Sequence, residues 1–226
     1  MQVTASIRWE SLTAPPVEER RARLAAAHLY AITADQESAR LATAAEACLR
    51  GGAQLLQLRH KALARGELLN LARRLHEVTA AAGVLLIVND HLDIALLADA
   101  DGVHLGEDDL SVAEARRLAG PNFLVGASAS NADAARTAAA AGADYLGAGP
   151  AFATPIKEAK PVIGPEGVAA VQQAVQIPVF AIGGVTPDNA PQLVAAGITR
   201  ACMIRGLFDS DDPEAAARAA LAALTA

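Results

Sequence analysis

The sequence predicts a single (β/α)8 barrel, and three observations carry that prediction. Eight short apolar runs alternate with stretches of helical periodicity from His28 onward. Glycine marks the end of most of the helical stretches. The length of 226 residues suits one domain at the smaller end of this fold. Eight such units close naturally into a barrel, whereas an open doubly wound sheet would more often stop at about five to seven strands.

The apolar runs read as strands buried on both faces, because such strands are continuously hydrophobic. In order they are LYAIT, LLQLR, LLIVND, GVHLG, FLVGAS, YLGAG, VFAIGG and ACMIRG. Between them, residues such as Leu41, Ala45 and Cys48 recur at helical spacing. The composition is 53% hydrophobic but 3% aromatic, so we expect a mainly aliphatic core.

Three helix starts can be predicted from local signals. Ser111 and Glu114 have the spacing of a capping box. Thr186-Pro187 and Asp212-Pro213 read as N-cap and first-turn pairs for the last two helices. Residues 1–27 are expected to form an N-terminal leader with a short helix that covers the bottom of the fold. Residues 28–226 are expected to form the catalytic barrel domain.

Composition excludes several classes of partner. The 19 basic and 25 acidic side chains give a formal net charge of -6, which argues against a nucleic-acid surface. No apolar run approaches the ~20 residues of a membrane span, and no secretory signal is visible, so a cytoplasmic protein is expected. Cys48 and Cys202 read as small buried hydrophobes. The sequence leaves the oligomeric state open, a homodimer included.

Basic side chains gather where strands are expected to end. In a β/α barrel the C-terminal ends of the strands share one site. Alternation places Gln57, Arg59 and Lys61 on one face of their strand, and Lys157 follows a later strand. A buried cationic cluster needs an anionic partner, since unpaired buried charge is costly. The alternative is a set of surface salt bridges at a strand end.

Acidic side chains follow the next two strands. Asp90 and Asp109 come from neighbouring strand ends without nearby cysteine ligands. Such a pair suits Mg²⁺, which takes one or two carboxylates and completes its shell with diphosphate oxygens and water. The alternative is that both residues are helix N-caps, since Asp109 lies close to Ser111.

Glycine turns follow the last two strands, at Gly183-Gly184 and Arg205-Gly206. Barrels frequently bind a phosphate monoester at this place through backbone N–H groups, although glycine also serves plain turns. Together the strand ends predict a diphosphate subsite and a monophosphate subsite. Two phosphorylated ligands in one cavity suggest group transfer with diphosphate as the leaving group.

Six segments resemble thiamine-phosphate synthases in order and spacing. They are QLRHK, VND, GVHLGEDDL, VGAS, GPAFATPIK and AIGG. The resemblance runs from His28 almost to the C-terminus. It implies a transferase with Mg²⁺ as cofactor that joins an aminopyrimidine diphosphate to a thiazole phosphate. The diphosphate would leave first, and the thiazole nitrogen would capture a pyrimidine carbocation, so no strong base is needed and no Ser-His-Asp or Cys-His set is apparent.

The resemblance also implies roles for individual residues. Substrate-binding positions would be Gln57, Leu58, Arg59, His60, Lys61, Asn89, Ser128, Thr154, Pro155, Ile156, Lys157, Gly183, Gly184, Ile204 and Arg205. Of these, Arg59, Lys61, Ser128 and Lys157 would be catalytic, and Asp90 and Asp109 would bind Mg²⁺. Gln57 would contact the pyrimidine. Thr154, Gly184 and the Ile204-Arg205 turn would receive the thiazole phosphate.

Four positions depart from the family pattern, namely His60, Glu107, Ser130 and Ile156. Ile156 removes a hydroxyl from the phosphate loop and is expected to weaken thiazole phosphate binding about ten- to a hundredfold. With Glu107 it motivates one alternative, a non-catalytic paralogue that binds thiamine precursors. The other alternative is the thiazole tautomerase of the same pathway. That family has a catalytic histidine where Ser130 stands, and His104 is the remaining candidate.

Overall fold

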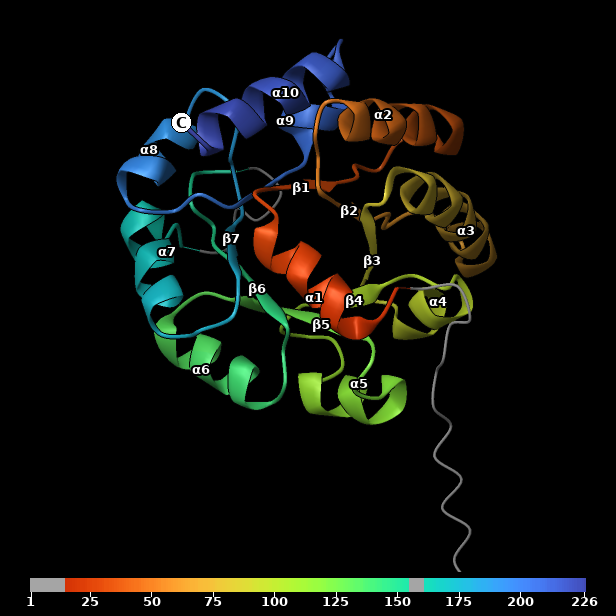
Figure 1. The fold of residues 1–226 in the computed structure, drawn as a ribbon, viewed down its shortest axis with the longest axis horizontal. Coiled ribbons are helices and arrows are strands. Elements are labelled where there is room, and N and C mark those ends of the chain that lie inside the picture. Colours follow the sequence, from red (N-terminus) through yellow and green to blue (C-terminus); the bar gives the residue numbers. More distant parts are fainter. Residues whose placement is uncertain (1–14, 155–160) are drawn as a thin grey trace, which may run out of the picture.

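The computed structural model describes residues 15–154 and 161–226, which form a closed barrel of eight parallel strands in sequence order (Figure 1). The strands are β1 (Leu29–Ile32), β2 (Leu55–Leu58), β3 (Leu85–Asn89), β4 (Gly102–Leu105), β5 (Leu124–Ala129), β6 (Tyr145–Ala148), β7 (Val179–Ala181) and β8 (Ala201–Met203). Each pairs with its neighbours in sequence, and β8 closes the ring on β1. The (β/α)8 barrel predicted from the sequence is confirmed.

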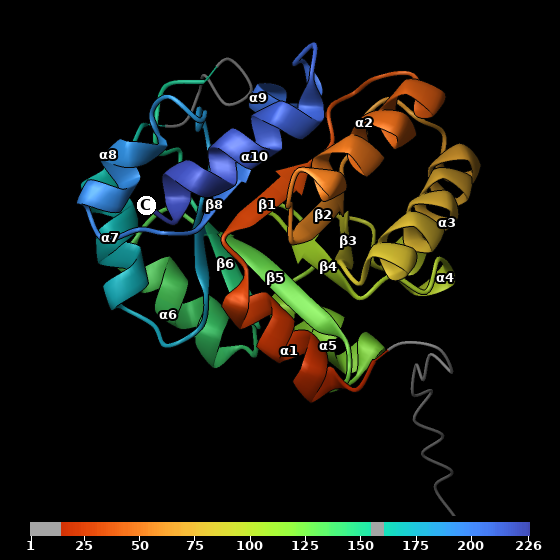
Figure 2. The same cartoon turned by 45° about the horizontal axis from the view of Figure 1, so that its top comes forward.

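Helices surround the barrel, with one further helix across its end (Figures 1 and 2). They are α1 (Val17–Ala26), α2 (Ser38–Arg50), α3 (Arg65–Ala82), α4 (Leu92–Leu97), α5 (Val112–Ala119), α6 (Ala132–Ala140), α7 (Gly164–Gln173), α8 (Ala190–Ala195), α9 (Arg205–Phe208) and α10 (Pro213–Leu224). Within the described ranges, no helix combines the length and the apolar character that a membrane crossing needs.

The predicted helix starts agree with the structure at two places and differ at one. Ser111 and Glu114 form the capping box of α5, and Asp212 accepts a hydrogen bond from the Ala215 amide at 3.0 Å in α10. The prediction for Thr186-Pro187 is wrong, because α8 begins only at Ala190. Thr186 and Asn189 instead hydrogen-bond to each other in the turn before α8. The side-chain amide of Asn189 also donates to the Gly184 carbonyl at 2.8 Å.

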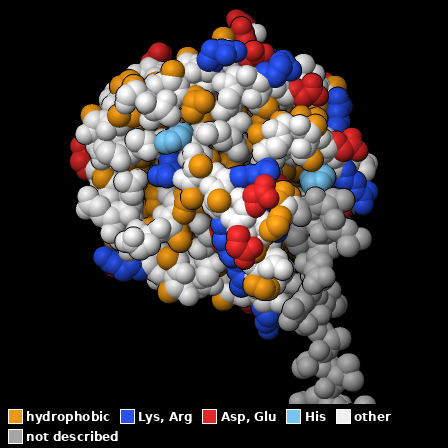
Figure 3. Space-filling model, in the orientation of Figure 1, with side chains coloured by type: hydrophobic (Ala, Val, Ile, Leu, Met, Phe, Trp, Pro, Cys, Tyr) orange, Lys and Arg blue, Asp and Glu red, His pale blue; other side chains and the backbone are white. Residues whose placement is uncertain are grey.

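Helix α1 lies across the N-terminal end of the barrel (Figures 1 and 2). The Arg20 guanidinium donates to the backbone carbonyls of Asp101 and Asn122, which lie just before β4 and β5. Leu24 is 1% exposed and packs among the inward-facing strand residues. Acidic and basic side chains are intermingled on the face crossed by this helix (Figure 3). The barrel is therefore closed from below.

Three aromatic side chains of the described residues lie inside the barrel. Tyr30, Tyr145 and Phe180 meet edge to face, with ring centroids 5.5 to 5.9 Å apart. Such pairs add to the free energy of burial, and they fix the ring positions. Gly126 makes room for this cluster, because a Cβ atom there would lie 2.1 Å from Cζ of Tyr145.

We expect Gly126→Ala to lower the free energy of unfolding by about 1–3 kcal/mol, the usual cost of overpacking a filled core. The Tyr145 ring is fully buried and cannot move without displacing its aromatic neighbours. Urea unfolding followed by circular dichroism measures the change. Gly66→Ala is the control, because nothing lies within 4 Å of an added Cβ on that position of α3. Equal midpoints for Gly126→Ala and wild type would show that the ring has free space.

Candidate active site

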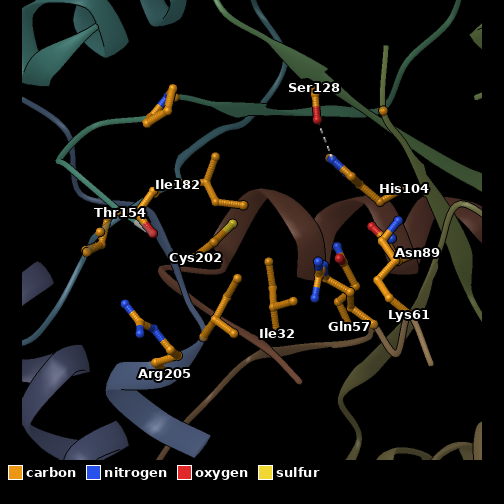
Figure 4. A pocket seen from close by; sticks show the side chains of 18 of the residues that line it. Ile32, Gln57, Lys61, Asn89, His104, Ser128, Thr154, Ile182, Cys202 and Arg205 are labelled. Carbon is orange, nitrogen blue, oxygen red and sulfur yellow. Dashed lines mark hydrogen bonds between the residues drawn. The ribbon is translucent and has the colours of Figure 1, made fainter. Parts of the chain in front are cut away.

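A cavity of about 610 Å³ lies at the C-terminal ends of the strands. Each of the eight strands contributes a lining residue, either from its last positions or from directly after it; these are Ile32, Gln57, Asn89, His104, Ser128, Gly149, Ile182 and Cys202. In Figure 4, Gln57, Lys61 and Asn89 lie on one side, and Thr154 and Arg205 lie on the other. Ile32, Ile182 and Cys202 separate the two groups. The cavity thus has two polar sides and an apolar middle.

Most of the predicted site residues come together around this cavity. Those that line it are Gln57, Arg59, Lys61, Asn89, Asp90, Asp109, Ser128, Thr154, Gly183, Gly184, Ile204 and Arg205. Pro155, Ile156 and Lys157 lie outside the residues that the structure describes. Glu107 lines the cavity as well, whereas Ser130 does not.

The structure contradicts the prediction that the side chains of Leu58 and His60 contact a substrate. Leu58 is 1% exposed and packs into the core between barrel and helices, because alternation along β2 turns it away from Gln57. The His60 ring lies 3.0 Å from the Gln36 carbonyl through Nε2, and the Leu63 amide donates to its Nδ1 at 3.2 Å. His60 therefore fastens two loops together outside the cavity.

The cations at the end of β2 are not the unpaired buried cluster that the sequence predicted. The Lys61 ammonium donates to the Asp90 carboxylate, and its side chain is 54% exposed. Arg59 lies 3.7 Å from the Asp35 carboxylate and is 21% exposed. Both positive charges already have a carboxylate partner. The salt-bridge alternative is thus correct in part, although both cations still face the cavity.

Asp90 and Asp109 meet at the mouth beside Lys61. Asp90 has left-handed backbone geometry with φ of 63°, and its amide donates to the His104 carbonyl at 2.8 Å. Asp109 accepts from the Gly106 amide at 2.7 Å. Neither caps a helix, because His91 precedes α4 and Ser111 precedes α5. The N-cap alternative is therefore wrong.

Asp90 and Asp109 each affect the pKa of the other. Burial raises the pKa of Asp109, and the hydrogen bond and charge of Asp90 raise it further. Burial acts in the same direction on Asp90, but hydrogen bonds from Lys61 and Asp109 outweigh it and lower the pKa of Asp90. The negative charge of Asp90 thus disfavours ionisation of Asp109, as expected of two neighbouring carboxyl groups.

This acid pair fits a hard divalent cation. Within residues 15–154 and 161–226 no group of three or more histidine, cysteine or acidic side chains is placed to hold a metal. Magnesium does not need such a group, since one or two carboxylates with phosphate oxygens and water satisfy its octahedral shell. Asp90 and Asp109 supply that number of carboxylates.

A serine–histidine pair occupies one wall of the cavity, and the sequence did not predict it. His104 Nε2 lies 3.2 Å from Ser128 Oγ, and His104 Nδ1 lies 3.2 Å from the Tyr145 hydroxyl (Figure 4). The third member is a phenol rather than a carboxylate, so this is not a Ser-His-Asp set. A signal was present, because both side chains point inward from adjacent strands at the same end.

The opposite side of the cavity is built from backbone. Gly183 and Gly184 have φ of 93° and 65°, and the Phe152 amide donates to the Gly183 carbonyl at 2.9 Å. A Cβ on Gly184 would lie 2.6 Å from the Ala153 carbonyl oxygen. The turns after β6 and β7 are thus packed backbone to backbone. Close approach of this kind is typical of sites where amides surround a phosphate.

Comparison with known proteins agrees with this arrangement. The family model described as thiamine monophosphate synthase matches residues 29–207. The chain belongs to this family. A thiamine-phosphate synthase of Natronomonas pharaonis is 45% identical over 195 residues, which cover 84% of this chain and 91% of that protein. The synthase of Moorella thermoacetica is 48% identical over 171 residues, which cover 75% of this chain and 81% of that protein.

Solved structures support the same assignment. The thiamine phosphate pyrophosphorylase of Pyrococcus furiosus superposes with a TM-score of 0.82 at 33% identity, covering 91% of this chain and 98% of that one. The 3-hexulose-6-phosphate synthase of Salmonella typhimurium has a TM-score of 0.68 at 14% identity, which shows the shared fold alone. Membership of the thiamine monophosphate synthase family confirms both the resemblance seen in the sequence and the predicted enzyme class, a transferase.

Proposed function

We propose that this member of the family joins 4-amino-2-methyl-5-hydroxymethylpyrimidine diphosphate to 4-methyl-5-(2-hydroxyethyl)thiazole phosphate or its carboxylated form. Thiamine phosphate and diphosphate would be the products. The observation that carries the proposal is the division of one cavity into a carboxylate side and a backbone-glycine side, with apolar residues between them. Two anionic groups and two flat rings are the ligands that such a cavity suits.

The carboxylate side would hold the diphosphate. Asp90 and Asp109 would bind Mg²⁺, which supplies charge neutralisation for the phosphate oxygens when bound. Lys61 lies against Asp90, so its ammonium stands where the leaving group would gain charge. Arg59 and Asn89 line the same side and would fix the orientation of the diphosphate. These groups would stabilise the departing anion more strongly than the bound substrate.

The pyrimidine would lie on Gln57, which is 2% exposed and faces the cavity from β2. Ser128 faces the cavity from β5 and would hydrogen-bond the pyrimidine or the leaving group. Departure of the diphosphate would leave a carbocation that the aminopyrimidine itself stabilises. The apolar residues Ile32 and Ile182 would keep water away from that cation.

The glycine side would hold the thiazole phosphate. The Gly183-Gly184 turn, Thr154 and the Ile204-Arg205 turn surround this end of the cavity. A phosphate anchored here would place the thiazole ring over the apolar middle, from which its nitrogen would attack the cation. Magnesium dependence and a cytoplasmic location belong to the same proposal.

Incubation of the purified protein with both precursors and Mg²⁺ tests this function. We expect thiamine phosphate and diphosphate in equal amounts by liquid chromatography and mass spectrometry, and no product when EDTA replaces Mg²⁺. Absence of Mg²⁺-dependent product overturns the proposal. Conversion of a thiazole tautomer alone would instead identify a tautomerase, and binding of both precursors without conversion would identify a non-catalytic paralogue.

A further inference from the structure

A continuous series of hydrogen bonds crosses the barrel beneath the cavity. Gln57 Nε2 donates to the Tyr30 hydroxyl at 2.7 Å, and the two tyrosine hydroxyls lie 2.9 Å apart. The Tyr145 hydroxyl then meets His104 Nδ1, and His104 Nε2 meets Ser128 Oγ, each at 3.2 Å. The series thus joins Gln57 to Ser128, and both of these residues line the cavity. Of the three side chains between them, Tyr30 and Tyr145 are at most 1% exposed, and His104 lines the cavity as well.

The number of available protons restricts the direction of these bonds. Each of the four links needs one proton, and each phenol has only one. Burial raises the pKa of Tyr30 and of Tyr145, so both hydroxyls stay protonated. A buried phenol proton without an acceptor is costly. A neutral imidazole carries one proton, so with His104 neutral all four links are filled only when they point the same way.

The Gln57 amide sets that direction. Because its Nε2 donates to Tyr30, the Tyr30 proton goes to Tyr145 and the Tyr145 proton goes to His104 Nδ1. His104 then carries its proton on Nε2 and donates to Ser128 Oγ. At one end, Gln57 turns its carbonyl oxygen to the cavity as an acceptor. At the other end, the Ser128 hydroxyl proton is free to donate into the cavity.

We propose that Tyr30, Tyr145 and His104 are positioning residues. Through them, whether Gln57 accepts or donates a hydrogen bond in the cavity determines whether Ser128 donates or accepts one. A ligand amino group that donates to Gln57 thereby selects the state in which Ser128 donates to an anionic oxygen. The reversed state would offer an amide N–H at Gln57 and a lone pair at Ser128. This inference rests on the proposed function, because the aminopyrimidine diphosphate presents both the amino group and the anion.

Packing holds the members of the series in place, so that only their protons and the Gln57 amide can reorient. Tyr30 and Tyr145 each contact Phe180 edge to face, and the His104 ring lies with its centroid 5.6 Å from that of Tyr145. Gly147 in β6 leaves room for the imidazole, because a Cβ there would stand 3.3 Å from His104 Cε1.

The histidine tautomer tests the inference without any substrate. In ¹⁵N-labelled wild-type protein we expect the His104 signals of a neutral ring protonated on Nε2, identified among the five histidines by their loss in His104→Gln. Tyr145→Phe removes the donor to Nδ1 and should shift the Nδ1 signal. A wild-type ring protonated on Nδ1 overturns the inference.

Ligand selectivity tests the coupling at the Gln57 end. Calorimetry with Mg²⁺ compares the 4-amino pyrimidine diphosphate with an analogue that has an oxo group in place of the amino group. Tyr30→Phe frees the Gln57 amide to turn, so the wild-type preference for the amino ligand should fall about tenfold. The control is Thr79→Val, which removes a buried hydroxyl in α3 outside the cavity and should keep the preference. An unchanged preference in Tyr30→Phe overturns the coupling.

Turnover tests the Ser128 end. Tyr145→Phe should lower kcat about tenfold, yet it should have little further effect in a Ser128→Ala background, because the hydroxyl that it orients is already gone. Losses that multiply in the double variant overturn the coupling. If wild-type protein binds the amino ligand selectively but makes no thiamine phosphate, the proposed function fails, and the tautomer and selectivity results still decide the inference.

Discussion

Asp90→Asn is expected to lower Mg²⁺-dependent turnover by about 10²–10³-fold, the range found when one electrostatic contact to a developing charge is lost. The substitution removes one carboxylate from the pair that would hold the metal and keeps the shape of the side chain. Asparagine also tolerates the left-handed backbone of this position, where φ is 63°. The loss should therefore come from charge and not from misfolding. Initial rates over a range of Mg²⁺ concentrations measure it.

The chain contains a matched control for this variant. Asp99 is also an aspartate with positive φ, at 53°, but it follows α4 at the lower end of the barrel and does not line the cavity. Asp99→Asn makes the same chemical change on the same kind of backbone and should leave turnover unchanged. If Asp90→Asn also keeps the wild-type rate and Mg²⁺ dependence, the metal assignment is wrong.

Gly184→Ala is expected to raise the KM for thiazole phosphate by about ten- to a hundredfold. The new Cβ would lie 2.6 Å from the Ala153 carbonyl oxygen and 2.9 Å from Phe152 Cβ, and φ is already 65°. The turn must open, which moves its amides away from the phosphate that they would bind. Loss of one hydrogen bond to a charged group costs about 1.5–3 kcal/mol, which corresponds to that range.

Two comparisons separate this effect from general strain. Gly197→Ala has the same left-handed backbone, with φ of 79°, but nothing lies within 4 Å of its added Cβ. It should lower stability slightly and leave both KM values unchanged. In Gly184→Ala the KM for the pyrimidine diphosphate should change little, because that ligand is placed on the other side of the cavity. An equal rise in both KM values would contradict the assignment of the glycine turn to the thiazole phosphate.

The features that were predictable from sequence follow from periodicity. Continuous apolar runs identified all eight strands, since only strands covered on both faces are hydrophobic at every position. Alternation correctly placed Gln57, Arg59 and Lys61 on the cavity side. The same rule turns Leu58 away from the cavity, so the prediction that its side chain contacts a substrate is wrong.

The features that were missed depend on contacts between distant segments. Asp35 follows β1 and pairs with Arg59, so no local pattern shows that this cation already has a partner. A tyrosine inside a strand reads as an ordinary core residue, and only the barrel brings Tyr30 within 2.9 Å of Tyr145. Asn189 overrides the Thr186-Pro187 signal for α8 because its side chain also holds the Gly184 carbonyl.

Helix α1 closes the end of the barrel opposite the cavity. Leu24 fills that end and Arg20 fastens the helix there, so a ligand would reach the cavity from the C-terminal ends of the strands. Gln57 lies deep at 2% exposure, whereas Arg205 is exposed at the opposite rim. In the proposed reaction, a pyrimidine seated on Gln57 would therefore have to enter before the thiazole phosphate covers it. By closing the other end of the barrel, helix α1 would favour that order of arrival.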